Sequence, residues 1–193
     1  MMLDVTKEMT IDGYLAFVSL PENEGKYFEL NHGEILEMTP PTTIHSYIVT
    51  TLSYFLYGFV LNHDLGFVFG DNTGYALSQW RLVIPDVSFV AKGRLNHPLP
   101  DLIPVAPDLA VEVISPSNTH REMTNKIEDY LEHGTKMVWV VYPEDKVIDV
   151  IRKTDDGGSY KRRYGGNDSL SGEDVIPNFS VAVAKIFPQQ NEA

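Results

Sequence analysis

The sequence predicts an α/β fold in which one mixed β-sheet is flanked by helices. First, 193 residues with 43% hydrophobic and 22% charged content are enough for one packed domain, expected to span residues 1–193. Second, the middle of the chain has the order helix, strand, strand, strand, helix, strand, which is typical of layered α/β proteins. Third, the chain has no internal repeat, heptad pattern or low-complexity tract that would indicate another architecture.

The N-terminal third predicts a helix, a hairpin and a long second helix. Residues 11–20 read as a short helix that Thr10 caps and Pro21 follows. Residues 26–30 and 34–38 flank "NHG", a turn in which Asn and Gly tolerate positive φ. A helix is then expected from Thr42 or Thr43 to about Asn62. Its apolar residues recur at helical spacing: Ile44, Ile48, Leu52, Phe55, Leu56 and Phe59.

The rest of the chain predicts most of the sheet and one further helix. Strand-like runs occupy residues 66–77, 82–90 and 109–114. A helix follows, in which Thr119 and Glu122 have capping-box spacing and Gly134 suits the C-terminal stop. Residues 136–143 and 146–151 read as a hairpin, and short strands are expected near residues 179–186 after a turn-rich stretch.

Composition and charge count against several classes of protein and exclude several kinds of site. The net charge of −12, from 27 acidic and 15 basic residues, counts against a sequence-blind binder of duplex nucleic acid. The absence of cysteine excludes disulfides, thiolate metal sites and cysteine nucleophiles. No apolar stretch reaches the roughly 18–20 residues of a membrane span, and the N-terminus lacks a secretory pattern. A cytoplasmic protein with no membrane partner is therefore expected.

Two acids lie within apolar strand-like segments. Glu112 lies in "PDLAVEVISPS", where an unpaired carboxylate would cost several kcal/mol, and Asp86 lies in "VIPDVSFV". If neighbouring strands aim both carboxylates at one face, their repulsion requires a cation or a shared proton. Hard oxygen ligands suit Mg²⁺, Mn²⁺ or Ca²⁺.

A lysine on the following helix completes the group. Lys126 lies at the edge of the expected buried stripe, from which it can reach over the preceding strand toward Glu112. Each residue also has a structural interpretation. Glu112 would be a buried acid satisfied by an arginine or backbone amides, Asp86 a strand-start acid, and Lys126 a solvated lysine. The ordered set of all three is much harder to explain structurally.

Several segments resemble a known family: "KYFELNHGEILEMTPPTTIHSYI", "VIPDVSFV", "PDLAVEVISPSN", "EMTNKIEDYLEHGTKMVWVV" and "IPNFSVAVAKIF". They are similar to the Uma-type restriction endonucleases, a bacterial branch of the PD-(D/E)XK nuclease superfamily. The resemblance covers nearly the whole chain and is most specific from Pro107 to Val141. It implies a restriction-endonuclease-like core with an N-terminal helix and hairpin.

The resemblance also implies roles for individual residues. Asp86 and Glu112 would be metal ligands, with Mg²⁺ or Mn²⁺ as the cofactor, and Glu29 would be a further acidic member of the site. The superfamily's lysine position is Ile114 here, so the lysine function points to Lys126. His45 lies in a family-like position near the start of the long helix, with a structural or an orienting role. Where the family often has Asp, this sequence has Glu122, which the capping box explains.

These features together predict a metal-dependent endonuclease that hydrolyses phosphodiester bonds, with DNA as the expected substrate. One alternative is a catalytically inactive nuclease-like interaction or regulatory module. The acidic composition favours it, because "YKRRY" (160–164) is the one basic cluster and reads as a solvated strand edge. A hydrolase of small phosphoesters is a third possibility, although no Walker loop or nucleophile elbow accompanies it. Cutting both strands of a duplex requires two sites, so a homodimer is a further hypothesis.

Overall fold

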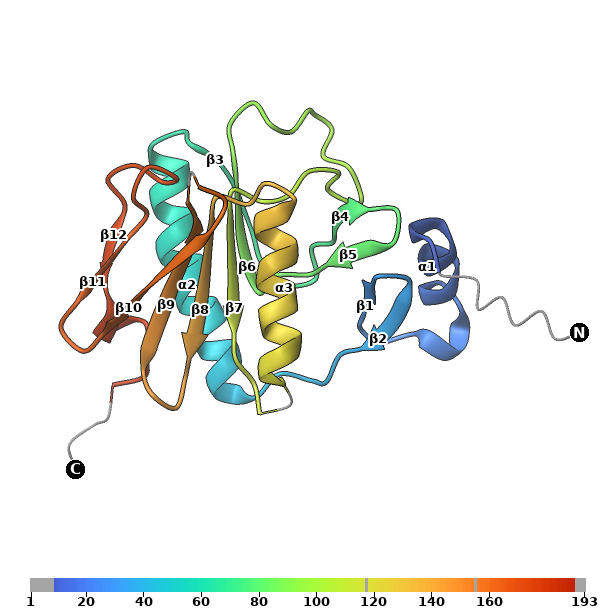
Figure 1. Ribbon diagram of the computed structural model, residues 1–193, viewed down its shortest axis with the longest axis horizontal. Helices are drawn as coiled ribbons and strands as arrows, with labels where there is room; N and C mark the ends of the chain where they lie inside the picture. The colour runs from blue at the N-terminus through green and yellow to red at the C-terminus, as the bar shows by residue number, and fades with distance from the viewer. Residues whose placement is uncertain (1–8, 117, 155, 190–193) are drawn as a thin grey trace, which may run out of the picture.

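A computed structural model describes residues 9–116, 118–154 and 156–189 (Figure 1). Residues 1–8 and Ser117 lie outside this range. The expectation that the N-terminus lacks a secretory pattern rests in part on residues 1–8. The helices are α1 (Ile11–Val18), α2 (Thr43–Asn62) and α3 (His120–Glu132), with short 3₁₀ turns η1 (Pro21–Asn23) and η2 (Val183–Lys185). The strands are β1 (Phe28–Asn31), β2 (Glu34–Glu37), β3 (Gly66–Phe69), β4 (Tyr75–Ser78), β5 (Arg81–Val83), β6 (Val87–Ala91), β7 (Leu109–Val113), β8 (Met137–Tyr142), β9 (Val147–Lys153), β10 (Ser159–Gly165), β11 (Ser169–Ser171) and β12 (Ser180–Ala182).

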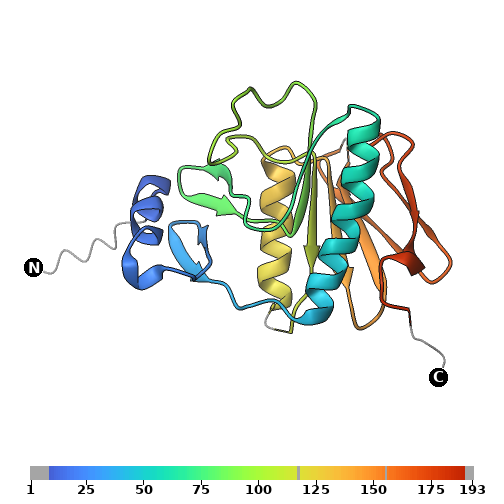
Figure 2. The same ribbon diagram turned by 180° about the vertical axis from the view of Figure 1, so that it is seen from behind.

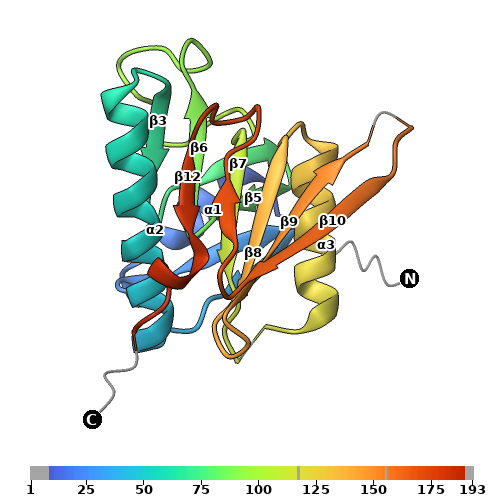
Figure 3. The same ribbon diagram turned by 90° about the vertical axis from the view of Figure 1, so that its left-hand side faces the viewer.

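A six-stranded mixed sheet forms the centre of the molecule, in the order β10-β9-β8-β7-β6-β3. Strands β7 and β8 are parallel and are joined by α3, whereas the other neighbours are antiparallel. A parallel pair needs such a crossover, because a tight turn can join only antiparallel strands. Helices α2 and α3 cover opposite faces of the sheet (Figures 1 and 3). The predicted mixed α/β fold is confirmed.

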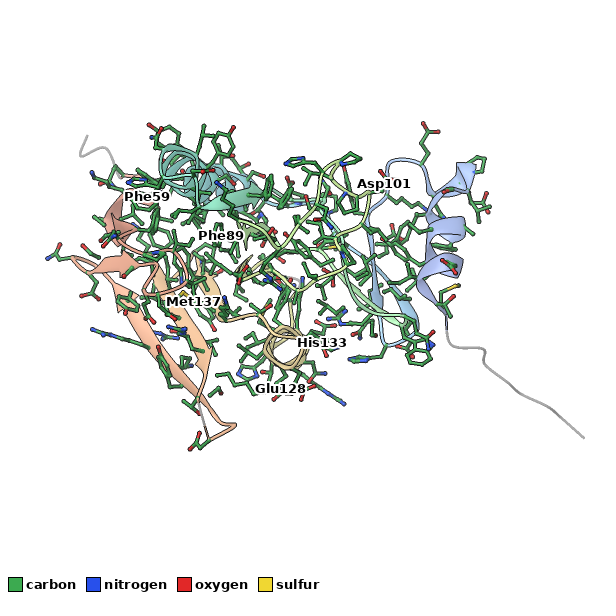
Figure 4. The ribbon with its side chains drawn as sticks, turned by 90° about the horizontal axis from the view of Figure 1, so that it is seen from above. Phe59, Phe89, Asp101, Glu128, His133 and Met137 are labelled. Carbon is green, nitrogen blue, oxygen red and sulfur yellow. The ribbon has the colours of Figure 1, made fainter. Side chains whose placement is uncertain are left out.

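The face of the sheet under α2 holds the larger hydrophobic core. Ile48, Val49, Leu52, Leu56 and Val60 are the apolar side chains that α2 buries. In Figure 4, Phe59, Phe89 and Met137 lie between α2 and the sheet, whereas Glu128 and His133 lie around α3 on the other side. The expected apolar stripe is therefore correct, except that Ile44 is 36% exposed.

Helix α2 contradicts the expectation that no apolar stretch of the chain is as long as a membrane span. Its 20 residues are long and apolar enough, by length and composition, to cross a membrane, so the conclusion that no stretch reaches this length is wrong. The helix packs one side against the sheet, as a core helix does. The other side faces outward, and its side chains are described further below.

Leu52 tests the core beneath α2. The side chain is completely buried, so Leu52→Ala removes three methyl(ene) groups and leaves a cavity between the helix and the sheet. We expect the free energy of unfolding to fall by about 2–5 kcal/mol in urea titrations. Ser46→Ala, an exposed position on the same helix, should change it by less than about 0.5 kcal/mol. Equal effects of the two substitutions would contradict the assigned core.

A second, four-stranded sheet, in the order β2-β1-β5-β4, packs with α1 beside the large sheet (Figure 1). Thr10 caps α1 by accepting a hydrogen bond from Gly13. The hairpin β1–β2 is present, but the residues with positive φ are His32 (48°) and Gly33 (84°), and Asn31 ends β1. A two-residue hairpin loop of type I′ has positive φ at both central positions, as His32 and Gly33 do, which explains the shift of one residue.

The run at residues 82–90 is two strands in two different sheets. Strand β5 belongs to the small sheet and β6 to the large one, and Ile84, Pro85 and Asp86 connect them. Proline cannot donate a hydrogen bond to a sheet, so the ladder breaks there. The run at residues 66–77 divides in the same way into β3 and β4. As a result, Asp86 lies at the entrance of β6 rather than inside a strand.

Strand β11 was not predicted from the sequence, and β10 was recognised only as a strand edge at "YKRRY". Strand β10 pairs with β9 over seven residues and forms the edge of the large sheet, and β11 pairs with β12. Five consecutive residues of β10 are exposed, so the strand lacks the hydrophobic alternation from which strands are recognised. The interpretation of "YKRRY" as a solvated strand edge agrees with this position.

Candidate active site

A cavity of about 510 Å³ lies where the small sheet, the large sheet, α3 and the start of α2 meet. The titratable side chains of its inner wall come from five different segments of the chain: Glu29, His45, Arg81, Asp86, Glu112 and Lys126. The break between β5 and β6 is what brings these segments together, because the connection from one sheet to the other passes along the cavity. Each predicted site residue therefore lines the same space.

Lys126 is the centre of the charged group. Its Nζ lies 2.7 Å from Oε1 of Glu29 and 3.0 Å from the carboxylate of Glu112. It also donates to the carbonyl oxygen of Ile84 at 3.4 Å. The ammonium is buried, which lowers its pKa, but the charges of Glu112 and Glu29 raise the pKa by more, so the group stays protonated.

Glu112 projects from β7 toward α3 and is almost completely buried. Its Oε1 accepts a hydrogen bond of 2.7 Å from the hydroxyl of Tyr130, one turn beyond Lys126 on α3. The pKa of Glu112 is raised to about 7, because burial and the nearby charges of Asp86 and Glu29 raise it by more than the charge of Lys126 and the hydrogen bond from Tyr130 lower it. The carboxyl is thus held in place by two groups of α3 while other acids repel its charge.

Asp86 is fixed by the end of the β6–β7 ladder. Val87, the first residue of β6, pairs with Val111 of β7. Asp86, just before β6, and Glu112 of β7 therefore occupy the next position along this antiparallel pair. Oδ2 of Asp86 accepts a 2.7 Å hydrogen bond from the backbone amide of Val113, and its own amide donates to the carbonyl of Val111 at 3.0 Å. The backbone therefore aims this carboxylate into the cavity that Glu112 also lines.

His45 approaches Asp86 from the first turn of α2. Its Nε2 lies 3.2 Å from Oδ1 of Asp86, and its buried Nδ1 has no hydrogen-bond partner among the described residues. Burial lowers the pKa of His45, but the hydrogen bond to Asp86 and the charges of Asp86, Glu112 and Asp71 raise it above its usual value. Of the two roles considered from the sequence, this contact fits that of orienting Asp86.

A second ion pair ties α3 to the small sheet. The guanidinium of Arg81 is 3% exposed and donates from Nε to Oδ2 of Asp129 at 2.6 Å. Its NH1 donates to the carbonyl of Leu30 at 3.3 Å and lies 3.9 Å from Oε2 of Glu29. Oε1 of Glu29 also accepts from the amide of Ile84 at 3.0 Å. Glu29 is consequently a buried member of the cavity and not a solvent-facing hairpin residue.

The donor set fits a divalent cation by charge and by chemistry. The described residues contain no group of three or more His, Cys, Asp and Glu side chains that would hold an ion by themselves. However, the three carboxylates of Glu29, Asp86 and Glu112 share one ammonium, that of Lys126, because Arg81 is paired chiefly with Asp129. When ionised, they exceed it by two negative charges. Mg²⁺ commonly binds through one or two carboxylates and keeps several waters, for which the cavity has room.

The comparisons with known proteins place the chain in a family. Residues 15–184 match the model of the Uma2 family, which is described as "Putative restriction endonuclease". The chain belongs to the Uma2 family. The resemblance noted in the sequence is therefore confirmed.

A solved structure shares the Uma2 fold found here. It is titled as the crystal structure of "a putative nuclease belonging to DUF820 from Anabaena variabilis ATCC 29413". The two chains are 20% identical and superpose with a TM-score of 0.77, over 93% of this chain and 97% of the other. No curated protein matches the sequence. At this level of identity the comparison with the crystal structure establishes the fold alone.

Sequence reasoning missed two residues of this Uma2 site. Tyr130 was not named as a candidate site residue, although its hydroxyl reaches Glu112. Arg81 was overlooked at the start of an apolar run. A buried tyrosine or arginine needs a polar partner, so each was a signal that an acid lies nearby. Which acid it contacts depends on the tertiary fold.

Proposed function

We propose that this Uma2 protein is a metal-dependent endonuclease that hydrolyses phosphodiester bonds, with DNA as the expected substrate. The observation that carries the proposal is the meeting of Asp86, Glu112 and Lys126 in one cavity. Asp86 comes from the connection that enters β6, Glu112 from β7 and Lys126 from α3. Membership of a family described as restriction endonucleases supports the same reaction class.

Asp86 and Glu112 are the residues that would hold Mg²⁺ or Mn²⁺. Such an ion supplies Lewis-acid chemistry when bound, by neutralising phosphate charge and acidifying water. The amide of Val113 and the imidazole of His45 fix the carboxylate of Asp86, and Tyr130 fixes that of Glu112. Both acids are thus positioned before any ligand arrives, which lowers the cost of binding.

Lys126 serves as a positive charge rather than as a base. The acids around it raise its pKa, so its ammonium keeps its proton near neutral pH. A phosphoryl group in the cavity gains negative charge on its oxygens as the bond to the leaving group breaks, and a fixed cation stabilises that charge. Glu29 and Glu112 together hold the ammonium in place.

The inactive-module alternative is favoured by one observation, the acidic rim of the cavity. Glu37, Asp71 and Glu122 also line it, and the chain carries a net charge of −12. A polyanionic substrate is repelled by such a rim unless cations screen it. Cleavage that requires millimolar Mg²⁺ or Mn²⁺ and fails without it would distinguish the nuclease from the module.

A cleavage assay tests the proposal. Wild-type protein with Mn²⁺ or Mg²⁺ should cut at least one of plasmid DNA, single-stranded DNA and RNA. Asp86→Asn and Glu112→Gln should each reduce the rate at least about 100-fold, because each removes a charged ligand from the site. Glu128→Gln, an exposed acid on α3, should retain wild-type activity. Absence of cleavage by the wild type, or equal cleavage by Asp86→Asn, would overturn the proposal.

A further inference from the structure

The outward face of α2 is apolar although it faces solvent. None of the 20 residues of the helix is Asp, Glu, Lys or Arg. Among the described residues, thirteen large hydrophobic side chains are exposed, and five of them are on this helix. Their exposed fractions are 36% for Ile44, 45% for Tyr47, 73% for Tyr54, 55% for Tyr57 and 61% for Leu61. Figure 2 shows α2 in front of the large sheet, and Figure 3 shows it at the left edge of the molecule with the sheet beside it.

Four of these five residues, all except Ile44, lie along one straight seam. Together with Thr50, which is also exposed, they include the series Tyr47, Thr50, Tyr54, Tyr57 and Leu61, which we call the α2 seam. Its steps of three, four, three and four residues are the spacing with which one helix packs along another. A surface helix whose outer face meets only water normally carries charged residues there. The α2 seam has the pattern of a helix–helix contact and lacks a partner in the described part of the chain.

Gly58 adds a notch beside the seam. It lies in the interior of α2, where glycine is a poor helix former compared with alanine. A Cβ built at this position would meet nothing within 4 Å, so no packing inside the described chain requires the glycine. The gap lies between Tyr54 and Leu61 along the helix surface, where a side chain of a second helix can enter.

We propose that a second copy of this chain packs its α2 seam against this one about a twofold axis. Two copies of a protein with a net charge of −12 repel each other, and α2 offers a face on which no like charges meet. The exposed seam side chains and Ile44 amount to roughly 500 Å² per copy, given 150–250 Å² for a whole aromatic side chain. Two such faces bury about 1,000 Å², the lower limit of a specific interface.

Other occupants fit this face less well. A nucleic-acid backbone needs lysine or arginine, and α2 has neither. A helix that lies on a membrane normally adds a basic polar face, whereas α2 has no lysine or arginine on any face and packs one side on the sheet. Self-association requires only that the face be complementary to itself, and a neutral seam of aromatic and small residues meets this condition. The inference does not rest on the proposed nuclease activity.

The contact would also connect the two candidate active sites. His45 lies on the inner side of α2, against Asp86, while the seam occupies the outer side of the same helix. Packing of two α2 helices would therefore hold both cavities in one fixed assembly. This arrangement follows from the proposed contact and is not needed for its test.

Light scattering tests the contact directly. At roughly 100 µM, above the micromolar dissociation constants found for modest interfaces, the wild type should have twice the mass of the 21.7 kDa chain. Tyr54→Lys combined with Tyr57→Lys should return it to 21.7 kDa with an unchanged circular dichroism spectrum. Tyr160→Lys, an exposed tyrosine on β10, is the matched control and should leave the dimer intact.

Gly58→Leu separates a loss of contact from a loss of folding. The substitution improves helix propensity and enters open space in one chain, so the thermal midpoint of a dilute, monomeric sample should not fall. It fills the notch, so the dissociation constant of the dimer should rise at least about tenfold. A lowered midpoint of the monomer, or an unchanged dissociation constant, would overturn the assignment of Gly58 to the contact.

The absence of cysteine allows a second test. In a twofold contact the residue near the middle of the seam meets its own copy, so Tyr54→Cys should form a disulfide-linked dimer under mild oxidation. Tyr160→Cys should remain a monomer on the same denaturing gel. The proposal is wrong if the wild type is monomeric at the higher concentration, if the double lysine variant remains dimeric, or if both cysteine variants cross-link equally. Binding of monomers to phosphatidylcholine vesicles would assign the face to a membrane instead.

Discussion

Lys126→Met is expected to lower the rate of Mn²⁺-dependent phosphodiester cleavage by about 100- to 1,000-fold, the usual cost of removing one fixed electrostatic stabiliser. The ammonium lies within 3.0 Å of both Glu29 and Glu112, which line the cavity with it. The guanidinium of Arg81, by contrast, is paired with Asp129, which lies outside the cavity lining. Methionine has a similar length and keeps the packing, but it leaves the charge of a reacting phosphate without that cation.

The measurement is the initial cleavage rate at saturating Mn²⁺, with Arg121→Met as the matched control. Arg121 is an exposed cation on the same helix and lies outside the cavity lining. It should retain a rate within about twofold of the wild type, because an exposed charge is largely screened. A Lys126→Met rate within tenfold of the wild type, in protein with an unchanged circular dichroism spectrum, would contradict the assigned role of the lysine.

Asp129→Ala is expected to lower the free energy of unfolding by about 3–5 kcal/mol, because it leaves the guanidinium of Arg81 buried without its partner. The pair is joined at 2.6 Å, and Arg81 is 3% exposed. Glu29 is 3.9 Å away and is already bonded to Lys126, so it compensates only in part. The pair also connects α3 to β5, so its loss should loosen the helix that carries Lys126.

Urea unfolding measures this cost, and two further variants check the cause. Glu128→Ala removes the neighbouring exposed acid and should change the free energy of unfolding by less than about 0.5 kcal/mol. The double variant Arg81→Met with Asp129→Leu replaces the pair with apolar groups and should recover most of the loss. If the double variant is as unstable as Asp129→Ala, then the cost comes from packing and not from the uncompensated charge.

The sequence predicted the elements whose signals are local. Thr119, Glu122 and Gly134 specify both ends of α3, and all three act in the structure as the sequence indicates. Thr42 begins α2 in the same way. Strand β10 was recognised only as a strand edge at "YKRRY", because an exposed edge strand has no hydrophobic alternation. Strand β5 was joined to β6 because Pro85 was read as part of one strand.

The sequence predicted the acids and the lysine of the candidate site, but it did not predict the hydrogen bonds and the second ion pair that hold them in place. An acid within an apolar strand is visible in a sequence, and for Glu112 that signal led directly to the cavity. The amide of Val113, the hydroxyl of Tyr130 and the guanidinium of Arg81 reach the acids through the tertiary fold. All three donors lie far along the chain from the acids that they contact, so no spacing rule could predict the pairs.

Titration of the protein with Mn²⁺ in a calorimeter tests the central claim most directly, because it requires neither a substrate nor turnover. We expect saturable binding of about one ion per chain, which Asp86→Asn and Glu112→Gln abolish and Glu128→Gln leaves unchanged. Binding that is absent in the wild type, or that persists unchanged in Asp86→Asn, would contradict the claim that these two carboxylates are placed together to hold a divalent cation.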